Sequence, residues 1–234
     1  AAIEDDLKSG RLPAVVATSL GTIVASVTLA AALAMSAPPE SNDVSLITVQ
    51  AIVFLQIGPI LLGVLAASTE YEGRQIVTTL TATPNRSLLL AGKAIAYLGV
   101  VVTVSVAAVS AGAATVWIVL DAHGTAPARP VDLGPLTGAA IYLVLIGLLA
   151  LAAAVLMRSL IGPLVTMLAL VLIVSPLLAG YTEHARVLPD RAGRLLYLPD
   201  SDPALTPGTG ALILLAWIAA TALAAVVAFT RRDA

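Results

Sequence analysis

The segment Leu133–Met157, LGPLTGAAIYLVLIGLLALAAAVLM, contains no charged residue. An α-helix needs roughly 20 apolar residues to cross a hydrocarbon core of about 30 Å, and this segment is longer than that. The pattern recurs on both sides, with uncharged segments at residues 12–39, 44–69, 94–120, 159–182 and 203–230. Only 11% of the residues are charged, against roughly 25% in soluble domains. The sequence therefore predicts an all-α integral membrane protein with six transmembrane helices.

We expect a single transmembrane domain over residues 1–234. Its spans are predicted at about residues 13–37, 45–69, 88–119, 135–157, 159–180 and 210–230. A closed β-barrel would need segments of about ten residues with alternating hydrophobicity, and the sequence has none. Acidic residues at 4–6 precede the first span, which is also longer than the apolar region of a signal peptide. We therefore interpret the first span as a retained transmembrane helix.

The distribution of Lys and Arg predicts the orientation. If the N-terminus is cytoplasmic, the inner segments hold Lys8, Arg11, Arg74, Arg86, Lys93, Arg158, Arg231 and Arg232, and the outer loops hold Arg129, Arg186, Arg191 and Arg194. The positive-inside rule then places both termini in the cytoplasm. The formal net charge is −2 and no basic patch is present, so we expect the lipid bilayer, and no nucleic acid, as a partner.

The six uncharged segments contain no Asp, Glu, Lys, Arg or His, although ion-driven carriers usually keep such a residue within the membrane. The chain has no cysteine, and its two histidines, His123 and His184, fall in predicted outer loops. We therefore expect neither a metal site nor a catalytic residue. The segment 87–94, SLLLAGKA, lacks both the leading glycine and the final Ser or Thr of a phosphate-binding loop. No nucleotide cofactor is expected on this chain, and energy for transport would come from a separate subunit.

A polar segment, Glu70–Lys93 (EYEGRQIVTTLTATPNRSLLLAGK), separates the second and third spans. On a helix its apolar positions form one narrow stripe, made by Gly73, Ile76, Val77, Leu80 and Pro84. This spacing predicts a short amphipathic helix at a surface, although the β-branched run at 76–79 lowers the helix propensity. Thr83 is then a predicted N-cap for a second helix that runs through Arg86 and Lys93 into the third span. An ordinary loop between spans is the alternative interpretation.

The same residues resemble a known pattern. The segment is similar to the cytoplasmic coupling segment of ATP-binding-cassette permeases of the type-two exporter family, in the residues Glu70, Glu72, Gly73, Leu80, Pro84, Arg86 and Lys93. The acidic start at 4–8 (EDDLK) and the end at 231–234 (RRDA) also resemble members of this family, the latter its actinobacterial members. The segment 188–210 resembles the stretch before the last span of these permeases, but it lacks the aromatic residue that often follows the position of Pro207.

The resemblance implies a six-helix permease subunit in a bacterial cell membrane. It would pair with a second permease copy or a paralogue and with two cytoplasmic ATPase subunits, which would bind ATP and Mg. The predicted coupling residues are Glu70, Glu72, Gly73, Arg74, Ile76, Val77, Leu80, Pro84, Arg86 and Lys93. The resemblance also implies export, with a drug, a peptide antibiotic or a lipid-like compound as the cargo.

Other features of the sequence predict details of the bundle. The outer segment 181–210 contains the apolar cluster 195–198, which fits short re-entrant helices or, equally, a plain surface loop. Gly58-Pro59 in the second span, and Gly162-Pro163 and Pro176 in the fifth, predict kinks.

Two other functional classes remain open from the sequence. One is a membrane accessory or binding subunit of a larger complex without transport of its own. The other is a membrane enzyme or facilitator that uses Gln50 and Gln56, which are six positions apart and do not share a helical face.

Overall fold

The structure is a computed structural model and describes residues 11–38, 42–68, 86–124, 130–202 and 204–232. These ranges contain helices and turns and no β-strand. The helices are α2 (Arg11–Ser36), α3 (Val44–Gln50), α4 (Ile52–Leu55), α5 (Ile57–Ser68), α7 (Arg86–Ala122), α8 (Leu133–Met157), α9 (Ile161–Ala169), the π-helical turn η1 (Leu170–Val174), α10 (Ser175–Ala179), the 3₁₀ turns η2 (Glu183–Val187) and η3 (Pro199–Ser201), α11 (Pro189–Arg194) and α12 (Pro207–Arg232).

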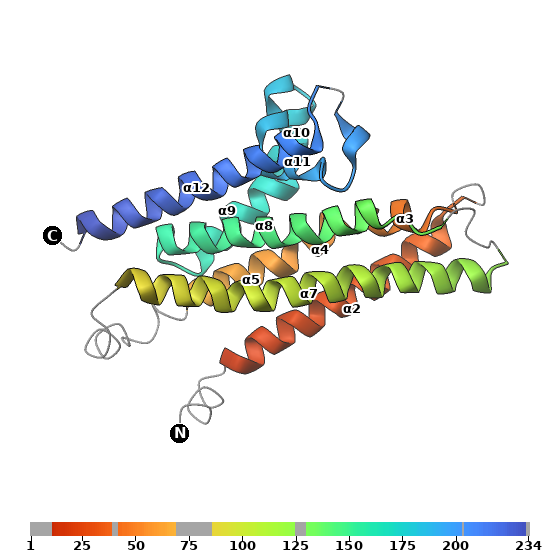
Figure 1. Cartoon of the computed structure of the whole chain (residues 1–234), viewed down its shortest axis with the longest axis horizontal. Coiled ribbons are helices and arrows are strands. Elements are labelled where there is room, and N and C mark those ends of the chain that lie inside the picture. The colour runs from red at the N-terminus through yellow and green to blue at the C-terminus, as the bar shows by residue number, and fades with distance from the viewer. Residues whose placement is uncertain (1–10, 39–41, 69–85, 125–129, 203, 233–234) are drawn as a thin grey trace.

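Six helical segments are long and apolar enough to cross a membrane, which confirms the predicted fold class at this level. They are Pro13–Ser36, Val44–Ala67, Ile95–Ala122, Leu133–Met157, Ile161–Ala179 and Pro207–Ala228. Each one overlaps a span expected from the sequence. Their order and antiparallel course bring the start of α2, the end of α5, the start of α7, the end of α8 and the end of α12 to one end of the bundle, on the left in Figure 1. We call this the terminal end.

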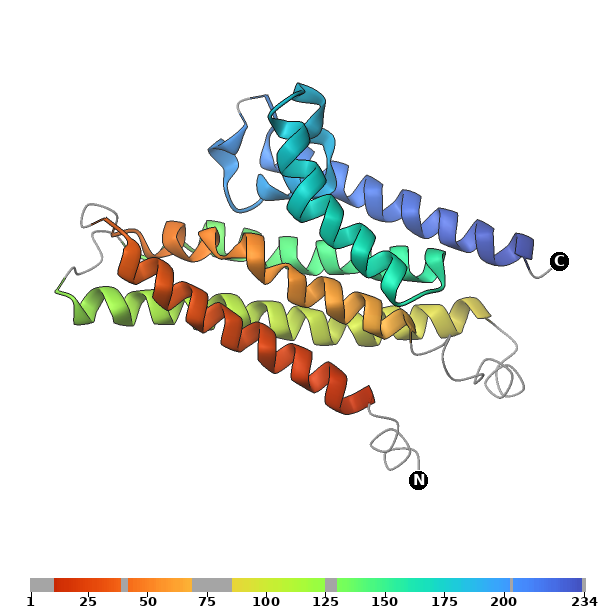
Figure 2. The same cartoon turned by 180° about the vertical axis from the view of Figure 1, so that it is seen from behind.

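Helix α8 is at the centre of the packing. It lies against α5 and α12 and also contacts α7, and α2 packs on α7 at the far side (Figures 1 and 2). Leu143, Ile146 and Ala150 of α8 are fully buried. By contrast, α12 exposes large apolar side chains such as Leu212 (66% exposed) and Leu223 (65%). An exposed apolar face of this kind is stable in hydrocarbon but costly in water, so it supports the membrane assignment.

The second span has two tighter helical turns before the proline that predicted a kink. They lie at Ala51 and Gln56, where ψ is −18° and −20°. Helical hydrogen bonds continue through Gln56, whose N–H donates to the Ile52 carbonyl and whose carbonyl accepts from the Ile60 N–H, so Val44–Ala67 is one helical span. Because Pro59 has no N–H, it cannot donate to the carbonyl four residues earlier, that of Leu55, and the helix loses one internal hydrogen bond there.

The fifth span shows one interruption where the sequence predicted two. Pro163 lies in the first turn of α9, where a missing N–H breaks no helical hydrogen bond, so no interruption occurs there. The kink predicted at Gly162-Pro163 is therefore not found as an interruption of the helix. Pro176, in contrast, is the second residue after the π-helical turn η1, and this wider turn accommodates the carbonyl that the proline leaves without a donor.

Candidate functional site

Most of the predicted coupling segment lies outside the described residues. This applies to Glu70, Glu72, Gly73, Arg74, Ile76, Val77, Leu80 and Pro84. The remaining two positions, Arg86 and Lys93, lie on one continuous helix, because α7 runs from Arg86 to Ala122 over 37 residues. At roughly 1.5 Å per residue this helix is about 55 Å long, well beyond a hydrocarbon core of about 30 Å. Its charged start precedes the apolar span Ile95–Ala122 and lies at the terminal end of the bundle (Figure 1).

The second span places a buried polar side chain within the bundle. Gln56 lies between α4 and α5 and is 3% exposed. Its Nε2 donates a hydrogen bond to the carbonyl of Val53 at 2.7 Å, and its Oε1 accepts one from the hydroxyl of Tyr142 on α8. Tyr142 is also buried, at 1% exposed. Both buried side chains thus have a hydrogen-bond partner, and the bond between them fixes the second span against the central helix.

A second tyrosine joins α7 to the second span. The hydroxyl of Tyr97 donates to the carbonyl of Pro59 at 3.1 Å. The approach depends on two glycines, because a Cβ atom at Gly147 would lie 2.2 Å from the Tyr97 hydroxyl and one at Gly63 would lie 2.5 Å from the Gly147 carbonyl. Helices α5, α7 and α8 therefore approach one another so closely that only glycine fits at positions 63 and 147.

The residues between α10 and α12 fold into a cap, which we define as residues 183–206. Its helix α11 and the segment after it pack on α8 and α12, on the side of the bundle opposite to α2 (Figures 1 and 2). A Cβ atom at Gly138 of α8 would lie 1.8 Å from the carbonyl oxygen of Leu196, and the indole Nε1 of Trp217 donates to the carbonyl of Val187 at 2.9 Å. The segment contains the short helices η2, α11 and η3, which fits one of the two alternatives considered for it. That these helices re-enter the bilayer stays a prediction.

The apolar cluster predicted at 195–198 is the inner face of the cap. Leu195 and Tyr197 are buried, while Leu196 and Leu198 are partly buried against the core. The ring of Tyr197 lies 5.3 Å from that of Tyr142, at an interplanar angle of 51°. Because Tyr142 also donates a hydrogen bond to Gln56, a chain of direct contacts leads from Gln56 in the second span to the cap.

Polar groups with incomplete partners lie behind this face. Atoms Oδ1 of Asp190, Nε of Arg194 and Oγ of Ser175 are buried and make no hydrogen bond within the described part of the chain. Burial raises the pKa of Asp190, and the nearby Ser175 hydroxyl and the Arg191 charge lower it by less. Burial also raises the pKa of Tyr197, so its phenol is neutral at pH 7. Desolvation therefore favours the uncharged form of both groups.

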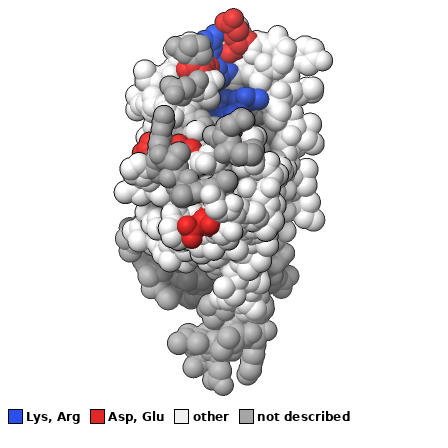
Figure 3. Space-filling model, turned by 90° about the vertical axis from the view of Figure 1, so that its right-hand side faces the viewer, with Lys and Arg blue, Asp and Glu red and all other residues white. Residues whose placement is uncertain are grey.

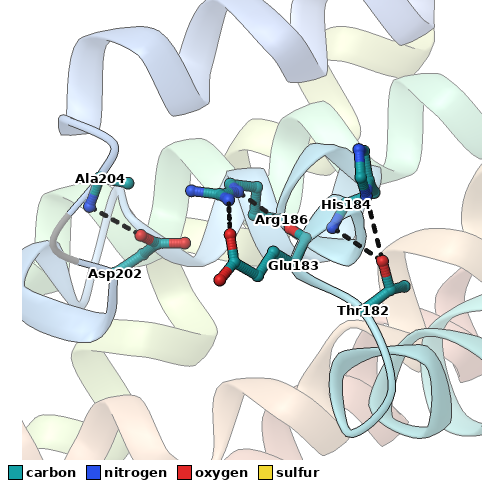
Figure 4. Close-up of polar contacts among 6 residues, drawn as sticks. All are labelled: Thr182, Glu183, His184, Arg186, Asp202 and Ala204. Carbon is teal, nitrogen blue, oxygen red and sulfur yellow. Dashed lines mark hydrogen bonds and ion pairs between the residues drawn. The ribbon is translucent and has the colours of Figure 1, made fainter.

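A pocket of about 360 Å³ opens between the cap and the end of α10. Its charged and hydroxyl-bearing lining residues are Thr182, Glu183, Arg186, Arg191, Arg194, Ser201 and Asp202. The guanidinium of Arg186 donates to the Glu183 carboxylate at 2.7 Å and, through Nε, to the Glu183 carbonyl at 2.9 Å. Asp202 faces Arg186 from the opposite wall and accepts a hydrogen bond from the Ala204 N–H at 2.8 Å (Figure 4).

The charges on this end of the molecule are unevenly placed. Viewed from the right of Figure 1, the visible basic side chains gather in one upper area beside acidic ones, and most of the remaining described surface is uncharged (Figure 3). Both histidines are exposed: His123 follows α7, and His184 in η2 contacts the Thr182 hydroxyl (Figure 4). Among the described residues, no group of three or more His, Asp or Glu side chains is arranged to hold a metal ion.

The polar contacts of the bundle were not predicted from the sequence. Gln56 was singled out, but its partner Tyr142 is 86 positions away, and Tyr97 was not considered. The available signal was the presence of two tyrosines within otherwise apolar spans. Gln50, the other glutamine of the second span, is exposed while Gln56 is buried, so the two amides do not form one site.

Comparison with known proteins adds no relative. No protein-family model matches the sequence, and a search of curated proteins finds no significant match. A function must therefore be supported by the helix arrangement, the polar contacts and the sequence pattern at 70–93.

Proposed function

We propose that this chain is the transmembrane permease subunit of an ATP-binding-cassette exporter. It would form the substrate pathway as a dimer, with a second copy or a paralogue, and separate cytoplasmic ATPase subunits that bind ATP and Mg would drive it. The cargo class that fits is a drug, a peptide antibiotic or a lipid-like compound. The observation that carries the proposal is the extension of α7 beyond its apolar span, with Arg86 and Lys93 in the continuation of the coupling-like segment.

The order of the helices supports this assignment, because it allows a movement to pass from the coupling-like segment into the bundle. The segment 69–85 joins the end of α5 to the start of α7, so a force applied to it acts directly on two spans. Helix α5 packs along α8, and α8 carries the cap through Gly138 and Tyr142. A displacement at the terminal end can thus be transmitted through packed helices to the cap. In the proposed orientation, the terminal end and both chain termini are cytoplasmic, in a bacterial cell membrane.

Polar contacts also hold the second span in place within the bundle. The Gln56–Tyr142 and Tyr97–Pro59 hydrogen bonds join it to α8 and to α7. They give α5 a defined position against α7 and α8, which an exporter would need in each of its states.

Co-purification tests the proposal against the accessory-subunit alternative. An affinity-tagged chain isolated from its native membranes in mild detergent is expected to bring down an ATP-binding-cassette ATPase in a stoichiometric ratio. The purified chain alone should bind no ATP, since the sequence has no phosphate-binding loop. Recovery of other membrane proteins without an ATPase would favour the accessory role, and saturable ATP binding by the isolated chain would contradict the division of labour.

A further inference from the structure

We propose that the pocket between the cap and α10 binds the anionic headgroup of an amphiphile. The principal ligands would be the guanidinium groups of Arg191 and Arg194, and the apolar part of the molecule would lie along α10. This site is distinct from the coupling segment, and its occupancy does not depend on the ATPase proposed above.

The charges of the pocket fit a single negative charge. Three arginines and two carboxylates line it, which leaves one positive charge. Arg186 is already engaged by Glu183 in an ion pair at 2.7 Å (Figure 4). Arg191 and Arg194 are therefore the donors available to a ligand. Guanidinium groups bind phosphate and carboxylate oxygens through two parallel N–H donors, which makes arginine the preferred residue for such groups.

One nitrogen of the Arg194 side chain has no hydrogen-bond acceptor. Its Nε is buried without an acceptor within the described residues, although the same side chain lines the pocket. Asp190 lies four residues before it on α11 but forms no ion pair with it, and burial favours the neutral form of that carboxyl by raising its pKa. Because this nitrogen is closed to solvent, a ligand in the pocket would contact the terminal nitrogens of Arg194, and the partial burial of that side chain strengthens such a contact relative to one at an exposed arginine.

The surroundings indicate that the anion belongs to an amphiphile. Ala179 and Thr182 form the pocket wall at the end of α10, next to large apolar side chains that no other part of the described chain covers. Among them, Leu177 is 59% exposed and Tyr181 is 82% exposed. The pocket volume of about 360 Å³ is at the lower end of the range for small-molecule sites and suits a headgroup better than a whole lipid. The acidic Glu183 and Asp202 offer acceptors for hydroxyl or amino groups on such a headgroup.

A fluorescence titration tests this inference on the full chain. The only two tryptophans are Trp117 and Trp217, so Trp117→Phe leaves Trp217 as the reporter. Its indole binds the carbonyl of Val187, the residue that follows Arg186. In phosphatidylcholine nanodiscs, dihexanoylphosphatidylglycerol should produce a saturable change in emission, and dihexanoylphosphatidylcholine should not. Native mass spectrometry of the same samples should count the bound phosphatidylglycerol independently of the tryptophan.

Matched substitutions assign the ligands. Arg191→Gln and Arg194→Gln should each weaken phosphatidylglycerol binding about tenfold, as expected for loss of a charge-assisted contact. The double variant Glu183→Gln/Arg186→Gln is the control, because it removes the ion pair and keeps the net charge of the pocket; it should change the affinity by less than about threefold. Since Arg191 is only partly buried, its substitution keeps the test valid if Arg194→Gln destabilises the cap.

Three results would overturn the inference. The first is the absence of saturable phosphatidylglycerol binding by both methods. The second is equal affinity for phosphatidylcholine, or an unchanged affinity in the Arg191 and Arg194 variants. The third is binding of glycerol 3-phosphate as tight as that of the lipid, which would identify a site for soluble phosphate compounds.

Discussion

Leu80→Asp is expected to abolish ATPase-driven transport while the bundle remains folded. Leu80 lies on the apolar stripe predicted for the coupling helix, the face that would enter the cleft of the ATPase. An unpaired carboxylate buried in such a contact costs several kcal/mol, enough to break a complex of ordinary affinity. The ATPase should dissociate or lose its stimulation by the permease, as measured by co-purification and by ATP hydrolysis in reconstituted membranes.

Thr79→Ser is the matched control for this change. It alters the neighbouring position on the predicted polar face by a single methyl group, and coupling should be unaffected. Position 80 precedes the apolar span that begins at Ile95, so expression and membrane insertion should survive in both variants. Normal ATP-dependent transport by Leu80→Asp would show that the segment is only a connecting loop.

Gly138→Ala is expected to detach the cap from the bundle. The added Cβ would lie 1.8 Å from the carbonyl oxygen of Leu196 and 2.5 Å from its carbonyl carbon, both of which are backbone atoms. Backbone cannot rotate away as a side chain can, so the segment after α11 must move. Overpacking of this kind costs about 1–3 kcal/mol, which corresponds to a roughly 5- to 150-fold rise in the detached population. Tryptic cleavage at Arg191 and Arg194 should accelerate accordingly.

Gly208→Ala provides the comparison for the cap experiment. This glycine lies in the first turn of α12, and an added Cβ would meet only the Thr206 hydroxyl, at 3.9 Å. Its cleavage rate should match that of the parent chain. An equal rate for Gly138→Ala would mean that the cap does not rest on α8 as described.

The fold class could be predicted from the sequence because charge placement alone locates membrane spans. Leu133–Met157 was delimited by charged residues on both sides, and α8 has these same bounds. The extension of α7 to Arg86 agrees with the helix expected to run through Arg86 and Lys93. Such features depend on local sequence, through length, apolarity and the exclusion of charge from hydrocarbon.

Features that depend on contacts between distant residues could not be predicted. The buried Gln56 is bonded by Tyr142 from another helix, and the Tyr97 contact requires Gly63 and Gly147 on two other helices. The kink predicted at Pro163 was also wrong. Pro163 lies in the first turn of α9, where a proline starts a helix and does not bend it. The exact start of a helix decides between these outcomes, and sequence alone sets such boundaries poorly.

The candidate site was predicted only in part. The pocket lies within the segment 179–205, whose opposite charges nearly cancel in the sequence and gave no sign of a ligand. Folding separates them, because Glu183 pairs with Arg186 while Arg191 and Arg194 remain available. The coupling segment at 70–85 lies outside the described residues, so its role stays a prediction.

Crosslinking from position 80 tests the central claim most directly. The chain contains no cysteine, so Leu80→Cys introduces a single attachment point for a photoreactive crosslinker in native membranes. The account predicts one dominant adduct, identified by mass spectrometry as an ATP-binding-cassette ATPase and reduced when ATP and vanadate are added. Adducts with lipid alone, or with proteins that lack a nucleotide-binding domain, would contradict it.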